Sequence, residues 1–223
     1  MTVKKMLFIP FLVALGAPGL APSQSGREVA ANADDIEREP GPGSDTCLHY
    51  NWKHFTTGNR TIENAIALPD GFKRLPAKPC SFAAWLRQLP LKQAGYKVHL
   101  YNGELKSNQS AHAAVIDIDV GDRDLQQCAD AVMRLRAEYL YGQKRFSEIA
   151  FHYTSGDEIP FSLWLSGQRP LVKNNRVRWA QMGSGDMSYN NFRNYMNNIF
   201  TYAGTASLSK ELKPVPFSEM RPG

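Results

Sequence analysis

The chain has 223 residues, of which 43% are hydrophobic and 11% aromatic, as is typical of a globular domain. Its formal net charge is +5. This surplus is too small to indicate a nucleic-acid partner. The HExxH, GxSxG, P-loop and GxGxxG motifs are absent, which removes the commonest zinc peptidases, serine hydrolases and nucleotide-binding proteins.

The first residues have the layout of a secretory signal peptide. Lys4 and Lys5 precede an apolar run, 6–20, that is interrupted by proline and glycine and is too short to span a bilayer. Small residues follow, and cleavage after Ser23 is expected. The mature chain would then be exported, with a periplasmic, envelope-associated or secreted location and no transmembrane segment.

Changes in composition along the sequence indicate how the rest of the chain is organised. A stretch rich in Pro, Gly, Ser and acidic residues precedes the first aromatic residues, and no later break is large enough to separate domains. We therefore predict a signal peptide (1–23), a flexible leader (24–46), a single α+β domain (47–213) and a loose tail (214–223).

Three cysteines are present, so an oxidising compartment would leave at least one free. Cys47 and Cys80 bracket an irregular segment and are the favoured pair, but the sequence leaves open whether they are joined. No spacing resembles a CxxC zinc site. No metal or cofactor is therefore expected.

Several elements are predicted from local patterns. A short helix over 82–89 begins after Ser81 and ends before Pro90, and a hairpin (96–101 and 104–107) surrounds Asn102-Gly103. A central unit follows: a strand (113–120), a helix (124–141) capped by Asp124 and a second strand (148–154).

The C-terminal part adds two strands, 161–165 and 177–180, separated by a turn at Lys173-Asn174-Asn175, and a helix over 189–203 that begins after Ser188. Together these elements predict an α+β domain with a mostly antiparallel, twisted sheet and two main helices packed on it.

The central helix has a predicted inner and outer side. Apolar residues at a spacing of three and four form a stripe that is expected to face the core: Leu125, Cys128, Val132, Leu135 and Tyr139. Polar residues fall on the opposite side and are expected to face water: Gln127, Asp130, Arg134 and Glu138.

Three stretches resemble an uncharacterised bacterial family, a domain of unknown function. They are G-F-K-R at 71–74 with S-F-A-A-W-L-R-Q-L-P-L-K at 81–92, D-L-Q-Q-C-A-D-A-V-M-R-L-R-A-E-Y-L-Y at 124–141, and F-T-Y-A-G-T-A-S-L at 200–208. The similarity covers roughly 62–212. It implies an envelope location but no reaction and no catalytic residues.

Cys128 is the one cysteine that could be chemical. A thiol near a helix N-terminus can serve as a nucleophile. The helix rises roughly 20 Å, and the returning strand would bring His152 back to the level of Cys128. Asp157 could orient this base, and Gln127 could donate to an oxyanion. This layout loosely resembles papain-like and transglutaminase-like hydrolases.

Other features favour a structural cysteine. Cys128 lies at the centre of the apolar stripe, and free cysteines are often buried. Nearby aspartates would also disfavour a thiolate. Two of them, Asp117 and Asp119, share a strand face and could bind a cation or act on a glycan. They could equally be a strand end that feeds a helix N-terminus.

A second candidate site lies between two tryptophans. Trp164, Arg169, Arg176 and Trp179 combine stacking surfaces with forked hydrogen-bond donors, which suits a sugar or an anionic polymer. The same stretch could instead be two half-buried strands joined by a solvated basic turn.

Two functional hypotheses result. The first, which needs fewer coincidences, is a non-catalytic envelope domain that binds cell-wall glycan or another envelope protein. The second is a cysteine hydrolase that cleaves amide bonds such as those of peptidoglycan.

Overall fold

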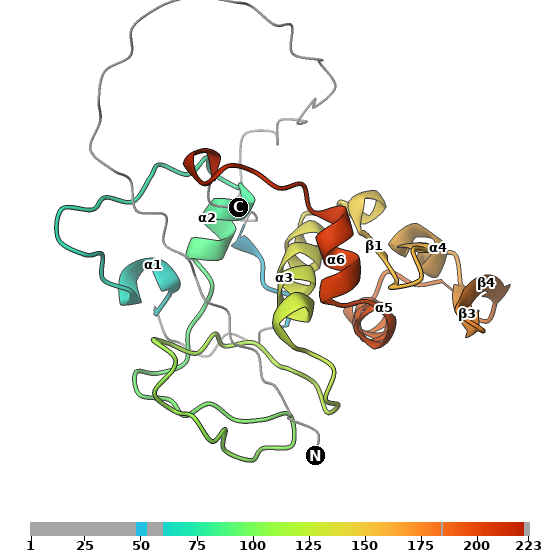
Figure 1. The fold of residues 1–223 in the computed structure, drawn as a ribbon, viewed down its shortest axis with the longest axis horizontal. Helices are drawn as coiled ribbons and strands as arrows, with labels where there is room; N and C mark the ends of the chain where they lie inside the picture. The colour runs from blue at the N-terminus through green and yellow to red at the C-terminus, as the bar shows by residue number, and fades with distance from the viewer. Residues whose placement is uncertain (1–47, 53–59, 184, 221–223) are drawn as a thin grey trace, which may run out of the picture.

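The computed structural model of the chain describes residues 48–52, 60–183 and 185–220 (Figure 1). Its helices are α1 (Ile62–Ala65), α2 (Phe82–Arg87), α3 (Cys128–Gly142), η2 (Phe146–Glu148), α4 (Phe161–Leu165), α5 (Tyr189–Tyr202), α6 (Thr205–Glu211) and η3 (Phe217–Glu219). Its strands are β1 (Ala150–His152), β2 (Glu158–Pro160), β3 (Gln168–Lys173) and β4 (Arg176–Gln181). None of the helices in these ranges is long and apolar enough to cross a membrane.

The α+β class is confirmed, but the predicted large sheet is wrong. The strands form two separate antiparallel pairs, β1 with β2 and β3 with β4. The predicted strand over 113–120 contributes only an isolated bridge, Leu91 to Ile116, and the predicted hairpin around Asn102-Gly103 only the bridge His99 to Leu105. Helices, not a sheet, therefore form the centre of the fold.

The predicted hairpin over 96–107 is present in a short form, because the Leu100 N–H donates to the Glu104 carbonyl and the Lys106 N–H donates to the Val98 carbonyl. The Gln109 amide oxygen accepts from the Val98 N–H at 2.9 Å, and its nitrogen donates to the Val98 carbonyl at 2.9 Å. The Gln109 side chain thus pairs the Val98 N–H and adds a second donor to the Val98 carbonyl, which also accepts from Lys106. The Asn102-Gly103 turn itself is present, with Gly103 at φ +82°.

The predicted strand over 161–165 is the short helix α4. Pro160 is its N-cap residue, and Phe161 and Trp164 are its buried residues. Their spacing of three positions puts both on one side of a helix, whereas in a strand they would face opposite sides. Five residues are too few for the apolar pattern to distinguish a helix from a strand.

Two helix predictions are confirmed together with their caps. The Ser81 hydroxyl accepts from the Ala84 N–H at the start of α2, and the Ser188 hydroxyl accepts from the Asn191 N–H at the start of α5. Each cap satisfies a backbone donor that the first helical turn leaves free. The signal is local, so the sequence was sufficient to predict it.

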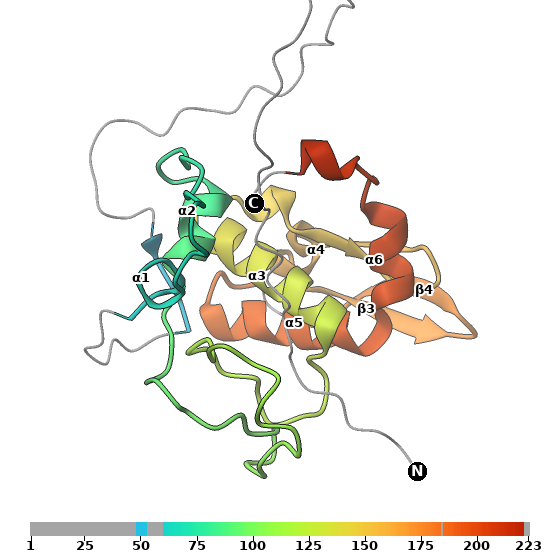
Figure 2. The ribbon, with the colours of Figure 1, turned by 60° about the vertical axis from the view of Figure 1, so that its left-hand side comes forward.

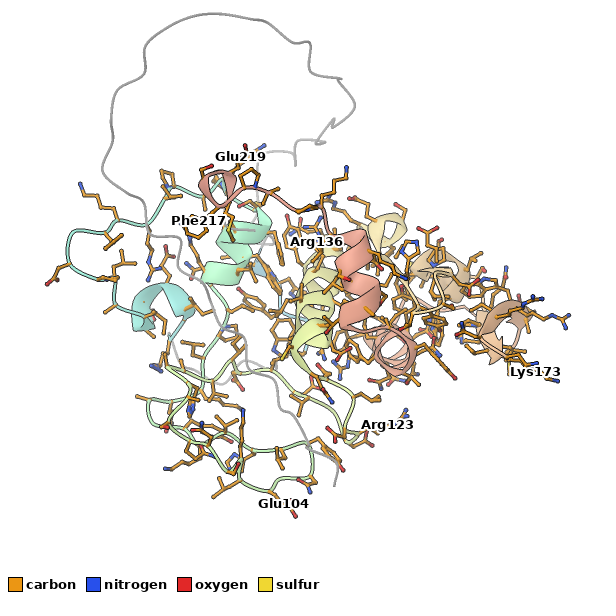
Figure 3. All side chains as sticks on the ribbon, in the orientation of Figure 1. Glu104, Arg123, Arg136, Lys173, Phe217 and Glu219 are labelled. Carbon is orange, nitrogen blue, oxygen red and sulfur yellow. The ribbon has the colours of Figure 1, made fainter. Side chains whose placement is uncertain are left out.

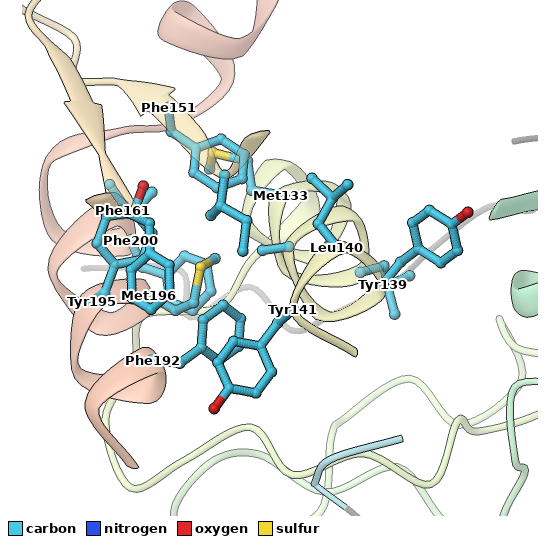
Figure 4. Packing of buried hydrophobic residues seen from close by; sticks show 14 of the residues in the cluster. Met133, Tyr139, Leu140, Tyr141, Phe151, Phe161, Phe192, Tyr195, Met196 and Phe200 are labelled. Carbon is cyan, nitrogen blue, oxygen red and sulfur yellow. The ribbon is translucent and has the colours of Figure 1, made fainter. Parts of the chain in front are cut away.

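The core lies where α3 faces α5 (Figure 4). Eleven of the fifteen residues of α3 are buried, so this helix is covered on several sides rather than along one stripe. Aromatic side chains fill the space between the two helices, with Tyr141 and Phe192 at a ring-centroid distance of 4.4 Å. Figure 2 shows α6 lying beside α3 and α5, with the β3–β4 ribbon at one end of the molecule.

One close backbone contact closes the base of the β3–β4 ribbon. The Gly167 carbonyl accepts from the N–H groups of Met182 and Gly183. Gly167 has φ +87°, and a Cβ atom there would lie 2.1 Å from the Gly183 oxygen. Only glycine fits this position, because the backbone is left-handed and the neighbour is rigid backbone.

We predict that Gly167→Ala destabilises the protein by about 3 kcal/mol or more, from the left-handed backbone and the overlap together. Gly156→Ala is the matched control, since Gly156 has φ +96° with nothing near its Cβ position. The control variant should lose only about 1–2 kcal/mol. Denaturant unfolding measures both, and equal losses would contradict the close contact.

Candidate functional site

Cys128 is the first residue of α3, and it is free and exposed. The prediction that the helix turns this sulfur into the core is therefore wrong. The helix begins four residues later than expected, because the Asp130 carboxylate accepts from the Gln127 N–H at 3.0 Å and fixes the start there rather than at Asp124. The stripe is also displaced, since Val132 is 47% exposed.

The other predicted catalytic residues make different contacts. The His152 ring nitrogen Nδ1 lies 3.1 Å from a Glu211 carboxylate oxygen, which also accepts from the His152 backbone N–H at 2.6 Å. These two contacts join β1 to α6. Asp157 accepts from the Ser155 hydroxyl within the β1–β2 turn. Across the described ranges, no hydrogen bond joins any two of Cys128, His152, Asp157 and Gln127.

Of the two remaining cysteines, Cys80 lies within the described residues. Cys80 is disulfide-bonded. Cys47, its favoured partner from the sequence, lies outside the described residues. No group of three or more His, Cys, Asp or Glu side chains in the described part of the chain is arranged to hold a metal ion.

The predicted binding residues divide into two groups, one of which forms the base of the β3–β4 ribbon. The Arg169 guanidinium stacks on the Trp164 ring at 4.0 Å and donates to the Trp164 carbonyl at 2.8 Å. It also donates to Asn191 Oδ1 at 3.2 Å, and that oxygen accepts from the Trp164 indole N–H at 2.8 Å. Trp164 and Asn191 are both buried. Arg169 and Trp164 therefore attach the ribbon to α5.

Arg176 and Trp179 lie on opposite faces of the ribbon. In the β3–β4 register Lys173 is opposite Arg176, Leu171 opposite Arg178 and Pro170 opposite Trp179. Side chains alternate along a strand, so Trp179 faces the core while Arg176 faces away from it. We call the outward surface the basic face, and it comprises Leu171, Lys173, Arg176 and Arg178.

The basic face is exposed at one end of the molecule. Lys173, at the tip of β3, marks that end in Figure 3. All four of its residues are exposed. Among the described residues, the side chains of Lys173, Arg176 and Arg178 make no ion pair or hydrogen bond. A stretch of sequence without Asp or Glu, 159–185, surrounds them.

A second polar group, which sequence reasoning placed on the solvent side, is buried. Arg134 is 1% exposed and Glu138 is 0% exposed, and the Arg134 Nε donates to Glu138 Oε1 at 2.6 Å. The other Arg134 nitrogens donate to Gln126 Oε1 at 3.2 Å, Asp119 Oδ2 at 3.3 Å and the Tyr189 hydroxyl at 3.2 Å. We call these five residues the Arg134 cluster.

The Arg134 cluster joins three parts of the fold. Tyr189, at the start of α5, donates to Glu138 Oε1 at 2.8 Å. Asp119, in the loop before α3, also accepts from Arg193 of α5 at 2.9 Å. Burial raises the pKa of Glu138. This effect is larger than the lowering of the same pKa by Arg134 and Tyr189. The pKa of Tyr189 is also raised, first by burial and then by the charge of Glu138.

This cluster is structural rather than a reaction centre. Glu138 and Arg134 have essentially no exposed surface, so a substrate could not reach them. Asp119, with a side chain that is 51% exposed, reaches solvent, but both of its oxygens already accept from arginine, and the half-buried Tyr189 already bonds to Arg134 and Glu138. The helical spacing of apolar and polar residues did not predict the cluster, because this spacing does not reveal which charges pair inside the fold.

We predict that Arg134→Met costs about 3–5 kcal/mol of stability, because it leaves the Glu138 carboxylate buried without its cation. Arg134→Met combined with Glu138→Leu should recover most of that loss, since no unpaired charge then remains in the core. Chemical unfolding of both variants gives the comparison. A double variant no more stable than Arg134→Met alone would contradict the pairing.

Cys128 gives a separate prediction. In the folded protein a small thiol reagent should label it readily, and Cys128→Ser should change stability by less than about 0.5 kcal/mol, as for other exposed positions. Mass spectrometry after labelling and thermal unfolding measure the two quantities. Slow labelling in the native state would show that the sulfur is covered.

Comparison with known proteins gives a family and nothing more specific. The model of the family described as domain of unknown function (4846) matches residues 62–223. No curated protein and no solved structure matches the chain. The matched region extends from α1 through η3 and includes both the Arg134 cluster and the basic face. The chain therefore belongs to the family of domain of unknown function (4846).

Proposed function

We propose that the protein is a non-catalytic, exported domain of the cell envelope that binds an anionic partner through the basic face. The observation that carries the proposal is that Lys173, Arg176 and Arg178 lie on one side of the ribbon, and within the described part of the chain none of them pairs with an acidic side chain. Like charges this close repel each other, and an anionic partner would remove that repulsion.

The cations of the basic face differ from the arginines that hold the helices and the base of the ribbon. Arg134 and Arg193 both donate to Asp119, and Arg169 is held by carbonyl oxygens and Asn191. Those guanidinium groups are already occupied by contacts that stabilise the fold. The cations of the basic face make no such contact among the described residues, so they remain available to a partner.

The base of the ribbon keeps the basic face in a fixed orientation. Trp164 and Arg169 attach the ribbon to α5 by stacking and hydrogen bonds, and the Gly167 carbonyl joins the residue before β3 to the residues after β4. A rigid presentation lowers the entropy lost on binding. The attachment therefore supports a role for the ribbon as a binding element.

The chemistry of the face favours charge recognition over sugar stacking. Trp164 is 6% exposed, and Trp179 packs toward the core, so neither ring is presented to a sugar beside the cations. Arginine instead forms forked hydrogen bonds with phosphate and carboxylate groups. We therefore favour a partner rich in phosphate or carboxylate groups over a neutral glycan.

Two observations support the envelope location. Cys80 is disulfide-bonded, and disulfides persist mainly in oxidising compartments. The pattern at the N-terminus, with Lys4 and Lys5 before an apolar run, is that of a secretory signal. The cysteine hydrolase hypothesis gains no such support, because His152 contacts Glu211 and no hydrogen bond links it to Cys128.

We predict that the combined variant Lys173→Gln, Arg176→Gln, Arg178→Gln binds immobilised poly-L-glutamate and polyphosphate roughly a hundred-fold more weakly than the unmodified protein. The estimate assumes about 1 kcal/mol for each surface cation. Retention at low salt, with neutral dextran as the blank, measures the effect.

The matched control neutralises three exposed lysines from other segments, Lys73, Lys97 and Lys210. Both variants lose three positive charges, so total charge is matched, although the ribbon variant loses two arginines and one lysine and the control loses three lysines. The control should retain most of the binding. Equal losses in the two variants would show that total charge rather than the basic face is responsible, and no loss in the ribbon variant would refute the proposal.

A further inference from the structure

The basic face contains apolar side chains beside its cations. Leu171 is 46% exposed and lies directly opposite Arg178. Met182, just beyond β4, is 63% exposed, and by strand alternation it continues the side of the ribbon that carries Arg176 and Arg178. A soluble polyanion binds through charge and does not need an exposed Leu or Met. While they face water, these two side chains contribute no free energy of apolar burial.

We propose that the anionic partner of the basic face is the surface of a lipid bilayer with anionic headgroups. This inference rests on the proposed function and names its partner. A bilayer presents negative charge at the headgroups and hydrocarbon just beneath, so it can accept cations and apolar side chains from one surface. The composition of the basic face fits that layering.

The arrangement on the ribbon is suited to this partner. Lys173 and Arg176 lie opposite each other beside the turn, and Leu171 with Arg178 is the next outward-facing pair along the strands. Long cationic side chains can extend to headgroup phosphates while the shorter Leu171 side chain enters the interface between them. The ribbon forms an end of the molecule, so it can approach a flat surface without interference from α2 or α3 (Figures 1 and 2).

The contact would be peripheral. Three cations contribute attraction that depends on the lipid charge, and one half-exposed leucine adds a modest apolar contribution. Binding should therefore require anionic lipid, weaken with salt and be reversible. An acidic protein would satisfy the cations but would not require the hydrocarbon of a bilayer.

The test is flotation of the full chain with vesicles of phosphatidylcholine, with and without phosphatidylglycerol. We expect binding only to vesicles that contain phosphatidylglycerol. Leu171→Thr, which keeps a strand-forming residue, should weaken that binding roughly five-fold through lost apolar burial. The same variant should be retained on soluble poly-L-glutamate as well as the unmodified protein.

Leu75→Thr is the matched control, because Leu75 is 49% exposed but lies in the segment between α1 and α2. It should leave vesicle binding unchanged. Equal vesicle binding by Leu171→Thr and the unmodified protein, or the absence of binding to phosphatidylglycerol vesicles with retention on poly-L-glutamate, would overturn the bilayer inference while the proposed function stands. Failure to bind either probe would overturn both.

Discussion

The pairing of Arg134 with Glu138 in the interior constrains the fold around it. A guanidinium and a carboxylate removed from water each lose several kcal/mol of hydration, which only close contacts can offset. The contacts come from the loop before α3 through Asp119 and Gln126, and from α5 through Tyr189. Arg134 and Glu138 both lie in α3, so their own pairing would survive a movement of α5 or the loop, but their remaining hydrogen bonds would be lost. The Arg134 cluster as a whole therefore favours one relative position of α3, α5 and the loop.

The same criterion separates structural charges from available ones. Inside the fold, Arg134 is matched by acceptors on every nitrogen, and Arg169 at the base of the ribbon is bound by carbonyl and amide oxygens. On the basic face, Lys173, Arg176 and Arg178 have no such partners among the described residues. An exposed cation stays hydrated, so it changes the stability of the fold very little whether or not it is paired. Their common location is what suggests a role outside the fold.

The sequence was most informative where a structural signal is local. The caps at Ser81 and Ser188 and the turn at Asn174-Asn175 involve neighbouring residues, so the short helix α2, the long helix α5 and the β3–β4 turn could be predicted. The strand predicted over 161–165 was wrong because its apolar pattern is too short to fix a period. The hairpin over 96–107 forms only two backbone bonds between its arms, and the Gln109 side chain pairs the Val98 N–H that no strand reaches.

The candidate sites show the same limit. Arg134 and Glu138 were assigned to solvent because polar residues usually face water, and only tertiary contacts reveal that they neutralise each other. Cys128 was assigned to the core from spacing that assumed a helix start four residues too early. For the ribbon, residue types indicated a cationic site, but only the strand register separates Trp179 from the exposed cations.

The salt dependence of binding tests most directly whether unpaired charges on the basic face carry the function. Affinity for poly-L-glutamate, measured by calorimetry over a series of NaCl concentrations, gives a slope of log affinity against log salt concentration. Three released counterions predict a slope of about −2 to −3. A slope near zero would contradict recognition by these three cations.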